Sequence, residues 1–378
     1  MAHRKRKNSR EEKEKVKVRS GREVITHATV NVPIRGDPES VSKLVRLMYA
    51  FRDAVRMALP HIRAGRSISE TKMIVRGKVN NVWYAYSASC FAKLIFEGLE
   101  EEKTWVKILK PFLVSSGDRS RKGNRNIRIE DINTLLVLYP FDGRGKFLKF
   151  SMNVPEKFHP VIEDLIREAR AGNATYGVSI SLKENGLVAH INAPLGIWLR
   201  YRKKKEKPLG GNIGAIDLNS DRLNLVIISP DGEILWRKTY WYSEVNSPGF
   251  PKGKAWALRL SALREAVSHA WMLGCSTIVF EDLFEIKKRR FTSSKRGNRK
   301  ISRFPKRKLL MHGILETLEW GMEPVLVDPR FSSLKGKEFG RELGWDEHSG
   351  SALALAVRFL YTTGRKCKFC QENRNLLC

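Results

Sequence analysis

Three consecutive predicted strands, with one carboxylate beside a buried strand, restrict the fold more than any other feature of this sequence. Residues 213–216 predict a buried strand, residues 223–228 a second apolar strand, and residues 233–242 a third strand after a Pro-Asp-Gly turn. Asp217 follows the first strand directly, and burial of a carboxylate costs free energy unless a cation or hydrogen-bond donors compensate for the lost water. Asp217 is therefore a candidate metal ligand, and the alternative is a carboxylate that caps a turn.

The charge of the chain indicates its partner. Among 378 residues, 70 Lys and Arg stand against 40 Asp and Glu, which gives a formal net charge of +30. Because 42% of the residues are hydrophobic, we expect a folded protein that binds a polyanion, and nucleic acid is the leading candidate. We find no apolar run of transmembrane length and no signal-peptide core, so we expect a soluble, cytoplasmic protein without a membrane partner. The single Gln, Gln371, is compatible with a thermophilic source.

The N-terminal half predicts a small β-barrel that is interrupted by helices. Residues 1–23 are charged and almost free of apolar side chains, so we expect a flexible basic arm. Within residues 24–208, a first strand precedes a helical insertion at about 38–132, whose first helix begins at Asp37-Pro38 and ends before Pro60. Pairing of the first strand with strands more than a hundred residues later would close the barrel.

The C-terminal half predicts an α/β domain. A Lys-rich segment that ends in Pro-Leu-Gly-Gly is the clearest linker, so we place the boundary between residues 208 and 209. Residues 209–365 run as three strands, a helix, a strand, a helix, a strand and a helix, which is the order of an RNase H-like fold. A Cys-containing tail, residues 366–378, follows this domain.

Three carboxylates stand at the ends of predicted elements in this domain: Asp217, Glu281 and Asp346. Strand ends and helix starts of one sheet can converge, and converging carboxylates repel each other unless divalent cations neutralise them. Two Mg²⁺ ions about 3.5–4 Å apart would activate water and stabilise the leaving oxygen of a cleaved phosphodiester. For Glu281 and Asp346 the alternative is a solvated cap, and Asp328, at the end of another strand, is a rival third acid.

Four segments that carry these acids resemble the split RuvC motifs of TnpB, a transposon-encoded family ancestral to the type V CRISPR effectors. The resemblance covers residues 209–362 in the family's order. It implies that Asp217, Glu281 and Asp346 bind two Mg²⁺ as the catalytic acids of an RNA-guided DNA endonuclease inside a prokaryotic cell. It also implies that the N-terminal half contains wedge-like and recognition domains that hold guide RNA and target DNA. The segments are Gly214-Ala215-Ile216-Asp217-Leu218-Asn219, Ile278-Val279-Phe280-Glu281-Asp282-Leu283, Val327-Asp328-Pro329-Arg330-Phe331-Ser332-Ser333 and Asp346-Glu347-His348-Ser349-Gly350-Ser351-Ala352.

One departure from the family concerns zinc. Family members commonly carry a four-Cys zinc ribbon before the third acid, but residues 334–344, which predict a Gly- and Lys-rich loop, contain no Cys. Cys367, Cys370 and Cys378 supply only three thiolates for Zn²⁺, so a fourth ligand would have to come from His348, another nearby group or a partner chain. The favoured interpretation is a tail that binds no zinc.

Two basic segments are predicted to contact nucleic acid. Residues 287–308 contain twelve Lys or Arg and no acidic residue, and they follow the second catalytic strand. The second segment is the loop 119–128 of the helical insertion. Tyr240, Trp241 and Tyr242 could stack on bases, although an aromatic cluster at a strand end is more often core. The residues predicted to bind phosphates are Arg119, Arg121, Lys122, Arg125, Arg128, Lys287, Lys288, Arg289, Arg290, Lys295, Arg296, Arg299, Lys300 and Arg303.

The sequence leaves three functions open. The first is an RNA-guided, Mg²⁺-dependent DNA endonuclease. The second is a guide-loaded DNA-binding or regulatory protein that does not cut, which the missing ribbon favours and the intact acids disfavour. The third is a guide-independent junction or flap nuclease, which is less favoured because roughly 200 residues precede the nuclease domain, enough for one or two further domains.

Overall fold

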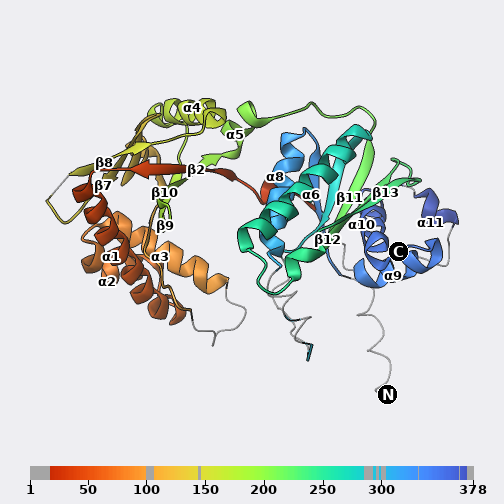
Figure 1. Ribbon diagram of the computed structural model, residues 1–378, viewed down its shortest axis with the longest axis horizontal. Coiled ribbons are helices and arrows are strands. Elements are labelled where there is room, and N and C mark those ends of the chain that lie inside the picture. The colour runs from red at the N-terminus through yellow and green to blue at the C-terminus, as the bar shows by residue number, and fades with distance from the viewer. Residues whose placement is uncertain are drawn as a thin grey trace, which may run out of the picture. The chain divides into compact units, whose positions relative to one another are not determined.

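The chain divides into two compact units, one of residues 26–202 and one that joins residues 1–25 to residues 203–378. Figure 1 shows both units in a computed structural model. Among the residues that the structure describes, no helix is both long and apolar enough to cross a membrane. The structure describes residues 18–98, 106–143, 146–284, 293–294, 298, 304–330, 332–365 and 367–372.

A mixed sheet organises the unit of residues 203–378. As predicted, β11 (Asn212–Leu218), β12 (Arg222–Ile228) and β13 (Ile234–Trp241) form an antiparallel meander. On the other side of β11, β14 (Cys275–Glu281) and β15 (Glu323–Val327) add in parallel. The resulting order β15-β14-β11-β12-β13 is that of an RNase H-like sheet.

One helix determines which face of this sheet carries the acids. The helix α10 (Glu347–Thr362) packs on β11 and β12, and its buried Ala and Leu side chains share a core with Ile213, Ala215 and Val279. Because alternate residues of a strand share a face, Asp217 and Glu281 stand on the same face as this core. The other helices of the unit are α6 (Lys252–Met272), α8 (Lys306–Glu319), α9 (Ser332–Leu343) and α11 (Lys368–Glu372).

The start of the described chain differs from the flexible basic arm predicted for residues 1–23. The strand β1 (Val18–Ser20) pairs antiparallel with β15, and the short 3-10 helix η1 (Gly21–Glu23) follows it. Arg19 forms an ion pair with Asp282 at 2.7 Å. Backbone hydrogen bonds to an open sheet edge order this charged segment without apolar side chains, which is why composition failed to predict it. The rest of the predicted arm, residues 1–17, lies outside the described residues.

An antiparallel sheet forms the unit of residues 26–202, in the order β3-β9-β10-β2-β8-β7-β6. The first strand pairs with a strand far along the chain, as predicted, with His27 opposite Pro194. Among the described residues β3 and β6 do not pair with each other, so the predicted barrel closure is not confirmed. The strands are β2 (His27–Arg35), β3 (Phe112–Ser115), β6 (Ile127–Asp131), β7 (Thr134–Leu138), β8 (Phe147–Met152), β9 (Gly177–Lys183) and β10 (Gly186–Pro194), and β4 (Gly117–Asp118) pairs with β5 (Gly123–Asn124).

Helices interrupt this sheet, over a shorter range than the predicted 38–132. The helices α1 (Pro38–Arg63), α2 (Ile68–Val79) and α3 (Val82–Glu97) come first, and the chain then returns to the sheet at β3. As predicted, Asp37 caps α1, accepting a hydrogen bond from the backbone N–H of Ser40 at 2.8 Å. The helix does not end before Pro60, because proline removes a single backbone hydrogen bond and the buried Ala58 and Ile62 hold the last turn. The helices α4 (His159–Arg170) and α5 (Leu195–Arg202) complete the unit.

The helix α9 replaces the loop predicted for residues 334–344. Its buried side contains glycines in place of an apolar stripe, so hydrophobic periodicity did not reveal it. A Cβ on Gly336 would lie 2.2 Å from Oγ of Ser351, and one on Gly350 would lie 2.0 Å from the carbonyl oxygen of Gly336. Only glycine therefore fits at both positions, and α9 packs against α10 through bare backbone.

Candidate active site

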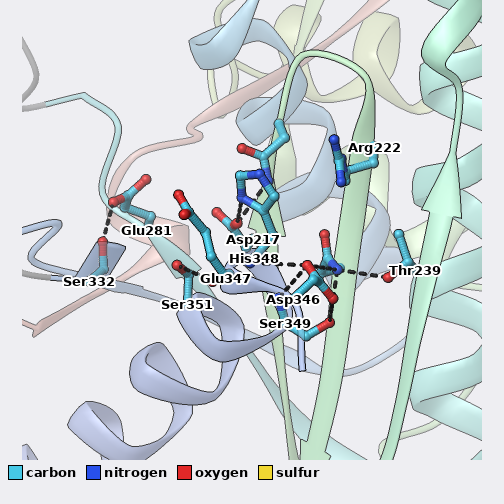
Figure 2. Close-up of polar contacts among 12 residues, drawn as sticks. Asp217, Arg222, Thr239, Glu281, Ser332, Asp346, Glu347, His348, Ser349 and Ser351 are labelled. Atoms are coloured by element: carbon cyan, nitrogen blue, oxygen red, sulfur yellow. Dashed lines mark hydrogen bonds and ion pairs between the residues drawn. The ribbon is translucent and has the colours of Figure 1, made fainter. Parts of the chain in front are cut away.

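The structure brings Asp217 and Glu281 together. They follow the last paired residues of β11 and β14, Ile216 and Phe280, on two strands that run parallel. Neighbouring strands of a sheet lie about 5 Å apart, so the two carboxylates are neighbours on one face. Figure 2 shows their side chains beside the start of α10.

The electrostatics of Glu281 reflect this proximity. Burial raises the pKa of Glu281 to about 7, and the negative charge of Asp217 raises it further, against a hydrogen bond that Ser332 donates. In that bond, Oγ of Ser332 lies 2.8 Å from Oε1. An acid with a pKa this high has too little positive charge around it to stabilise its ionised form. The pair therefore has the charge distribution of a site that would accept a cation.

The side chain of Asp217 is held in place by two neighbours. Nδ2 of Asn219 donates a hydrogen bond to its Oδ2 at 2.7 Å, and Nδ1 of His348 lies 3.2 Å from the same oxygen. The turn that carries Asn219 is fixed in its turn, because the hydroxyl of the buried Tyr242 donates to the carbonyl oxygens of Asn219 and Arg222. His348, Tyr242 and Asn219 are site residues that the sequence did not assign to this role.

Asp346 serves as the N-cap of α10 in this structure. Its Oδ1 accepts from the backbone N–H groups of His348 and Ser349 at 3.0 and 3.1 Å, and its Oδ2 accepts from Oγ of Ser349 at 2.6 Å. Burial acts to raise the pKa of Asp346, but the hydrogen bonds from Ser349 and His348 outweigh it and lower the pKa below its usual range. Asp346 thus lies close to the paired acids with its carboxylate engaged by the helix terminus.

Glu347 faces the same space as the paired acids and was not assigned a role from the sequence. A cleft of about 860 Å³ is lined by Asp217, Glu281, Glu347 and His348, while Asp346 is not among its lining residues. Figure 2 shows the Glu347 side chain extending toward the acids. The signal for it was the Asp-Glu pair at a helix start, because the residue after an N-cap projects from the first turn.

The rival third acid, Asp328, is occupied by a cation of the chain. Its Oδ2 lies 2.7 Å from Nη2 of Arg330, and hydrogen bonding to Arg330 lowers the pKa of Asp328. Arg330 and Lys306 line the cleft, so positive side chains stand opposite the acids. This arrangement makes Asp328 a support for Arg330 at the cleft wall.

The donor set of the cleft fits a hard divalent cation. Carboxylate oxygens are the ligands that Mg²⁺ prefers, and the raised pKa of Glu281 indicates an uncompensated negative charge. No group of three His, Cys, Asp or Glu side chains among the described residues is arranged to hold a metal ion as it stands. A third carboxylate would therefore have to turn toward Asp217 and Glu281 when a cation binds.

The predicted zinc ligands do not come together in the described chain. Cys367 is buried in the core beneath α10, where its sulfur leaves no room for a side chain at Gly232. Burial in this apolar core makes Cys367 a packing residue here. Cys378 and the side chain of Cys370 lie outside the described residues.

The basic loop near residue 120 divides into two groups. Arg125 lies 2.7 Å from the carboxylate of Asp118, and its guanidinium stacks 3.9 Å from the ring centroid of Trp83. Arg128 stacks similarly on Phe147 at 4.8 Å. The exposed members are Arg119, Arg121 and Lys122. The predicted phosphate ligands Lys287, Lys288, Arg289, Arg290, Lys295, Arg296, Arg299, Lys300 and Arg303 lie outside the described residues.

Asn224 supports Asp346 from inside the core, and its loss is expected to be costly. The fully buried Nδ2 lies 2.8 Å from Oγ1 of Thr239, 3.0 Å from Oγ of Ser349 and 3.4 Å from Oδ1 of Asp346. We expect Asn224→Leu to lower the free energy of unfolding by about 1–3 kcal/mol, because these groups would lose a donor where water cannot replace it. Urea denaturation measures the change. Lys238→Ala, on the opposite face of β13, is the control and should change it by less than about 0.5 kcal/mol.

The fold and site define an RNase H-like α/β protein with paired acids in an open cleft. Residues 27–203 match the family model of the SSO2105 N-terminal domain. The uncharacterized protein SSO2105 of Saccharolobus solfataricus is 37% identical over 330 residues, which are 84% of this chain and 88% of that protein. The chain therefore belongs to the SSO2105 family. An uncharacterized protein of Aeropyrum pernix is 21% identical over 249 residues, 62% of this chain and 67% of that protein.

Two kinds of solved structure are also similar. A complex of Cas12f1 with single guide RNA and target DNA aligns with a TM-score of 0.48 and 11% identity, over 84% of this chain and 83% of that chain. RuvC of Thermus thermophilus bound to a Holliday junction aligns with a TM-score of 0.28 and 15% identity, over 40% of this chain and 96% of that chain. Both scores lie below 0.5, and the RNase H-like assignment rests on the strand order itself.

Proposed function

We propose that this chain is an RNA-guided, metal-dependent DNA endonuclease of the TnpB type. The observation that carries the proposal is the pair Asp217 and Glu281, adjacent on parallel strands in an open cleft, with the pKa of Glu281 raised to about 7. Buried like charges at a cleft mark functional sites more often than structural ones. The ordered RuvC-like motifs and the net charge of +30 support a nucleic acid as the substrate.

The residues of the cleft would divide the work of phosphodiester cleavage. Asp217, Glu281 and a carboxylate from the start of α10 would hold Mg²⁺, which activates water and stabilises the leaving oxygen when bound. Asn219 and Ser332 would keep the two strand-end carboxylates oriented through their hydrogen bonds. Lys306 and Arg330 would attract the scissile phosphate into the cleft.

Two neighbouring acids could supply the third carboxylate, and we expect Asp346 to do so. Its capping bonds use only part of the capacity of its two oxygens, which can accept about four hydrogen bonds. We expect Asp346→Asn to lower the cleavage rate about 100-fold or more, with the fold retained because asparagine also caps helices. Glu347→Gln should retain most of the rate. Cleavage assays on both variants test this, and the opposite ranking would transfer the role to Glu347.

The proposed function is tested with the complete protein and the RNA that it carries. The chain is expressed together with its own flanking DNA, and the copurifying RNA is sequenced. We expect a discrete RNA and Mg²⁺-dependent cutting of DNA that matches it. Cutting that survives RNase treatment would indicate a guide-independent nuclease. Retention of matching DNA without cutting would indicate a regulatory binding protein, the alternative favoured by the lack of three preassembled ligands among the described residues.

A further inference from the structure

An exposed tryptophan stands at the end of the edge strand β13. Trp241 is 61% exposed, whereas its neighbours Tyr240 and Tyr242 are buried in the core as the sequence favoured. The guanidinium of Arg222, opposite Trp241 on β12, lies 4.1 Å from the centroid of its ring. Nε of Arg222 donates to Oδ1 of Asp221 at 3.1 Å, which anchors the guanidinium against the ring. The indole is thus supported on one side and largely open to solvent.

The register of the sheet places this pair beside the acids. Asn224 is opposite Asp217 on β11 and opposite Thr239 on β13. Arg222 and Trp241 lie two residues further along the same strands, so they share the face that carries Asp217. From the spacing of strands and residues, Trp241 lies roughly 12 Å from Asp217 along the backbone. This distance corresponds to a few nucleotides of a strand at about 3.4 Å each.

The surroundings of Trp241 favour an anion. A second arginine on the same face of β13, Arg237, stacks 4.7 Å from the ring centroid of Trp345, immediately before Asp346. Two arginines therefore flank the approach to the start of α10, each fixed against an indole. An unpaired base offers an open π-face to Trp241, and its phosphates are complementary to these charges. In a duplex the bases are already stacked on each other, so a single strand fits best.

We propose that Trp241 and Arg222 form a stacking site for an unpaired base of a single-stranded nucleic acid that leads into the acidic cleft. The inference deepens the proposed function, because it names the form in which the substrate reaches Asp217. It rests on that function only for the outcome of binding, since stacking on Trp241 requires neither metal nor cleavage.

The test measures binding of a fluorescein-labelled thymidine strand of about 20 nucleotides, longer than a typical single binding site, to the full chain in EDTA. We expect Trp241→Ala to weaken binding about 5- to 100-fold, while Trp241→Phe retains most of the affinity. An abasic strand of the same length should bind wild type and Trp241→Ala equally. Tyr361→Ala removes an aromatic ring that is 44% exposed at the other end of α10, and should leave binding unchanged.

Several outcomes would overturn the stacking site. Equal affinity of wild type and Trp241→Ala for the thymidine strand would do so, and so would an equal loss on the abasic strand, which would assign the contact to the phosphates. A changed oligomeric state in light scattering, with unchanged binding, would identify a protein interface instead. Trp241-dependent binding without any cleavage in Mg²⁺ would refute the nuclease and support the stacking site. If Trp241→Ala loses its circular dichroism spectrum, Trp241→Leu replaces it in every comparison.

Discussion

Replacement of Asp217 by alanine is expected to abolish DNA cleavage, with a loss of about 1000-fold or more. The carboxylate stands at the centre of the cleft, between Glu281 and the start of α10, and no neighbouring group among the described residues reproduces its position. The folded state should persist, because the substitution removes one of two like charges that repel each other. Cleavage of guide-matched DNA under single-turnover conditions measures the effect.

The binding of RNA separates loss of chemistry from loss of structure in this experiment. Asp217→Ala should retain the copurifying RNA at the wild-type level, because the site of cleavage is not required to hold a guide. Asp231→Ala removes an acid from the hairpin between β12 and β13, outside the cleft, and should cut normally. Undiminished cutting by Asp217→Ala would show that the acids of this cleft are not the catalytic centre.

Glutamine at position 281 is expected to stabilise the metal-free protein at alkaline pH. The pKa of Glu281 is about 7 in the folded state, against 4.5 for an unperturbed glutamate. Between these values the unfolded chain has lost its proton while the folded chain retains it, so the free energy of unfolding falls as pH rises from about 4.5 to 7. The full loss is of the order of 3 kcal/mol above pH 7, and Glu281→Gln escapes it.

Unfolding in urea at pH 5 and pH 8, without metal, measures this effect. The advantage of Glu281→Gln over wild type should be large at pH 8 and much smaller at pH 5. Addition of Mg²⁺ at pH 8 should stabilise wild type but not the variant, because a ligand that binds only the folded state shifts the equilibrium toward it. Glu233→Gln, an exposed glutamate before β13, should show no such pH dependence. An advantage of the same size at both pH values would contradict the raised pKa.

The strands of the RNase H-like unit were predictable because their sequences are apolar without interruption. The runs at 213–216 and 223–228 gave β11 and β12, and the order of elements gave the sheet. Segments held by other forces were not predictable from hydrophobic pattern. The charged β1 is ordered by the edge of a sheet, and α9 by a glycine contact, and neither leaves a periodic signal in the sequence.

The candidate site was predictable to the level of which strands meet, and no further. Acids at the ends of adjacent parallel strands must lie together, so Asp217 and Glu281 could be paired from the sequence. The roles of Asp346 and Glu347 depend on backbone geometry at one helix start, where the cap turns its carboxylate inward to the N–H groups and the next residue projects outward. A one-residue difference of this kind is set by local backbone angles that the pattern does not encode.

The contact of Gly336 with Gly350 has a consequence for how substitutions would be tolerated along this chain. Neither residue has a side chain that could touch a nucleic acid, yet any Cβ there would force α9 away from α10. That displacement would tilt the helix whose first turn carries Glu347 and His348. In a library that samples every amino acid at every position and selects for activity, these two glycines would be as intolerant as a catalytic acid. The exposed Lys337, one residue further along α9, would accept most replacements.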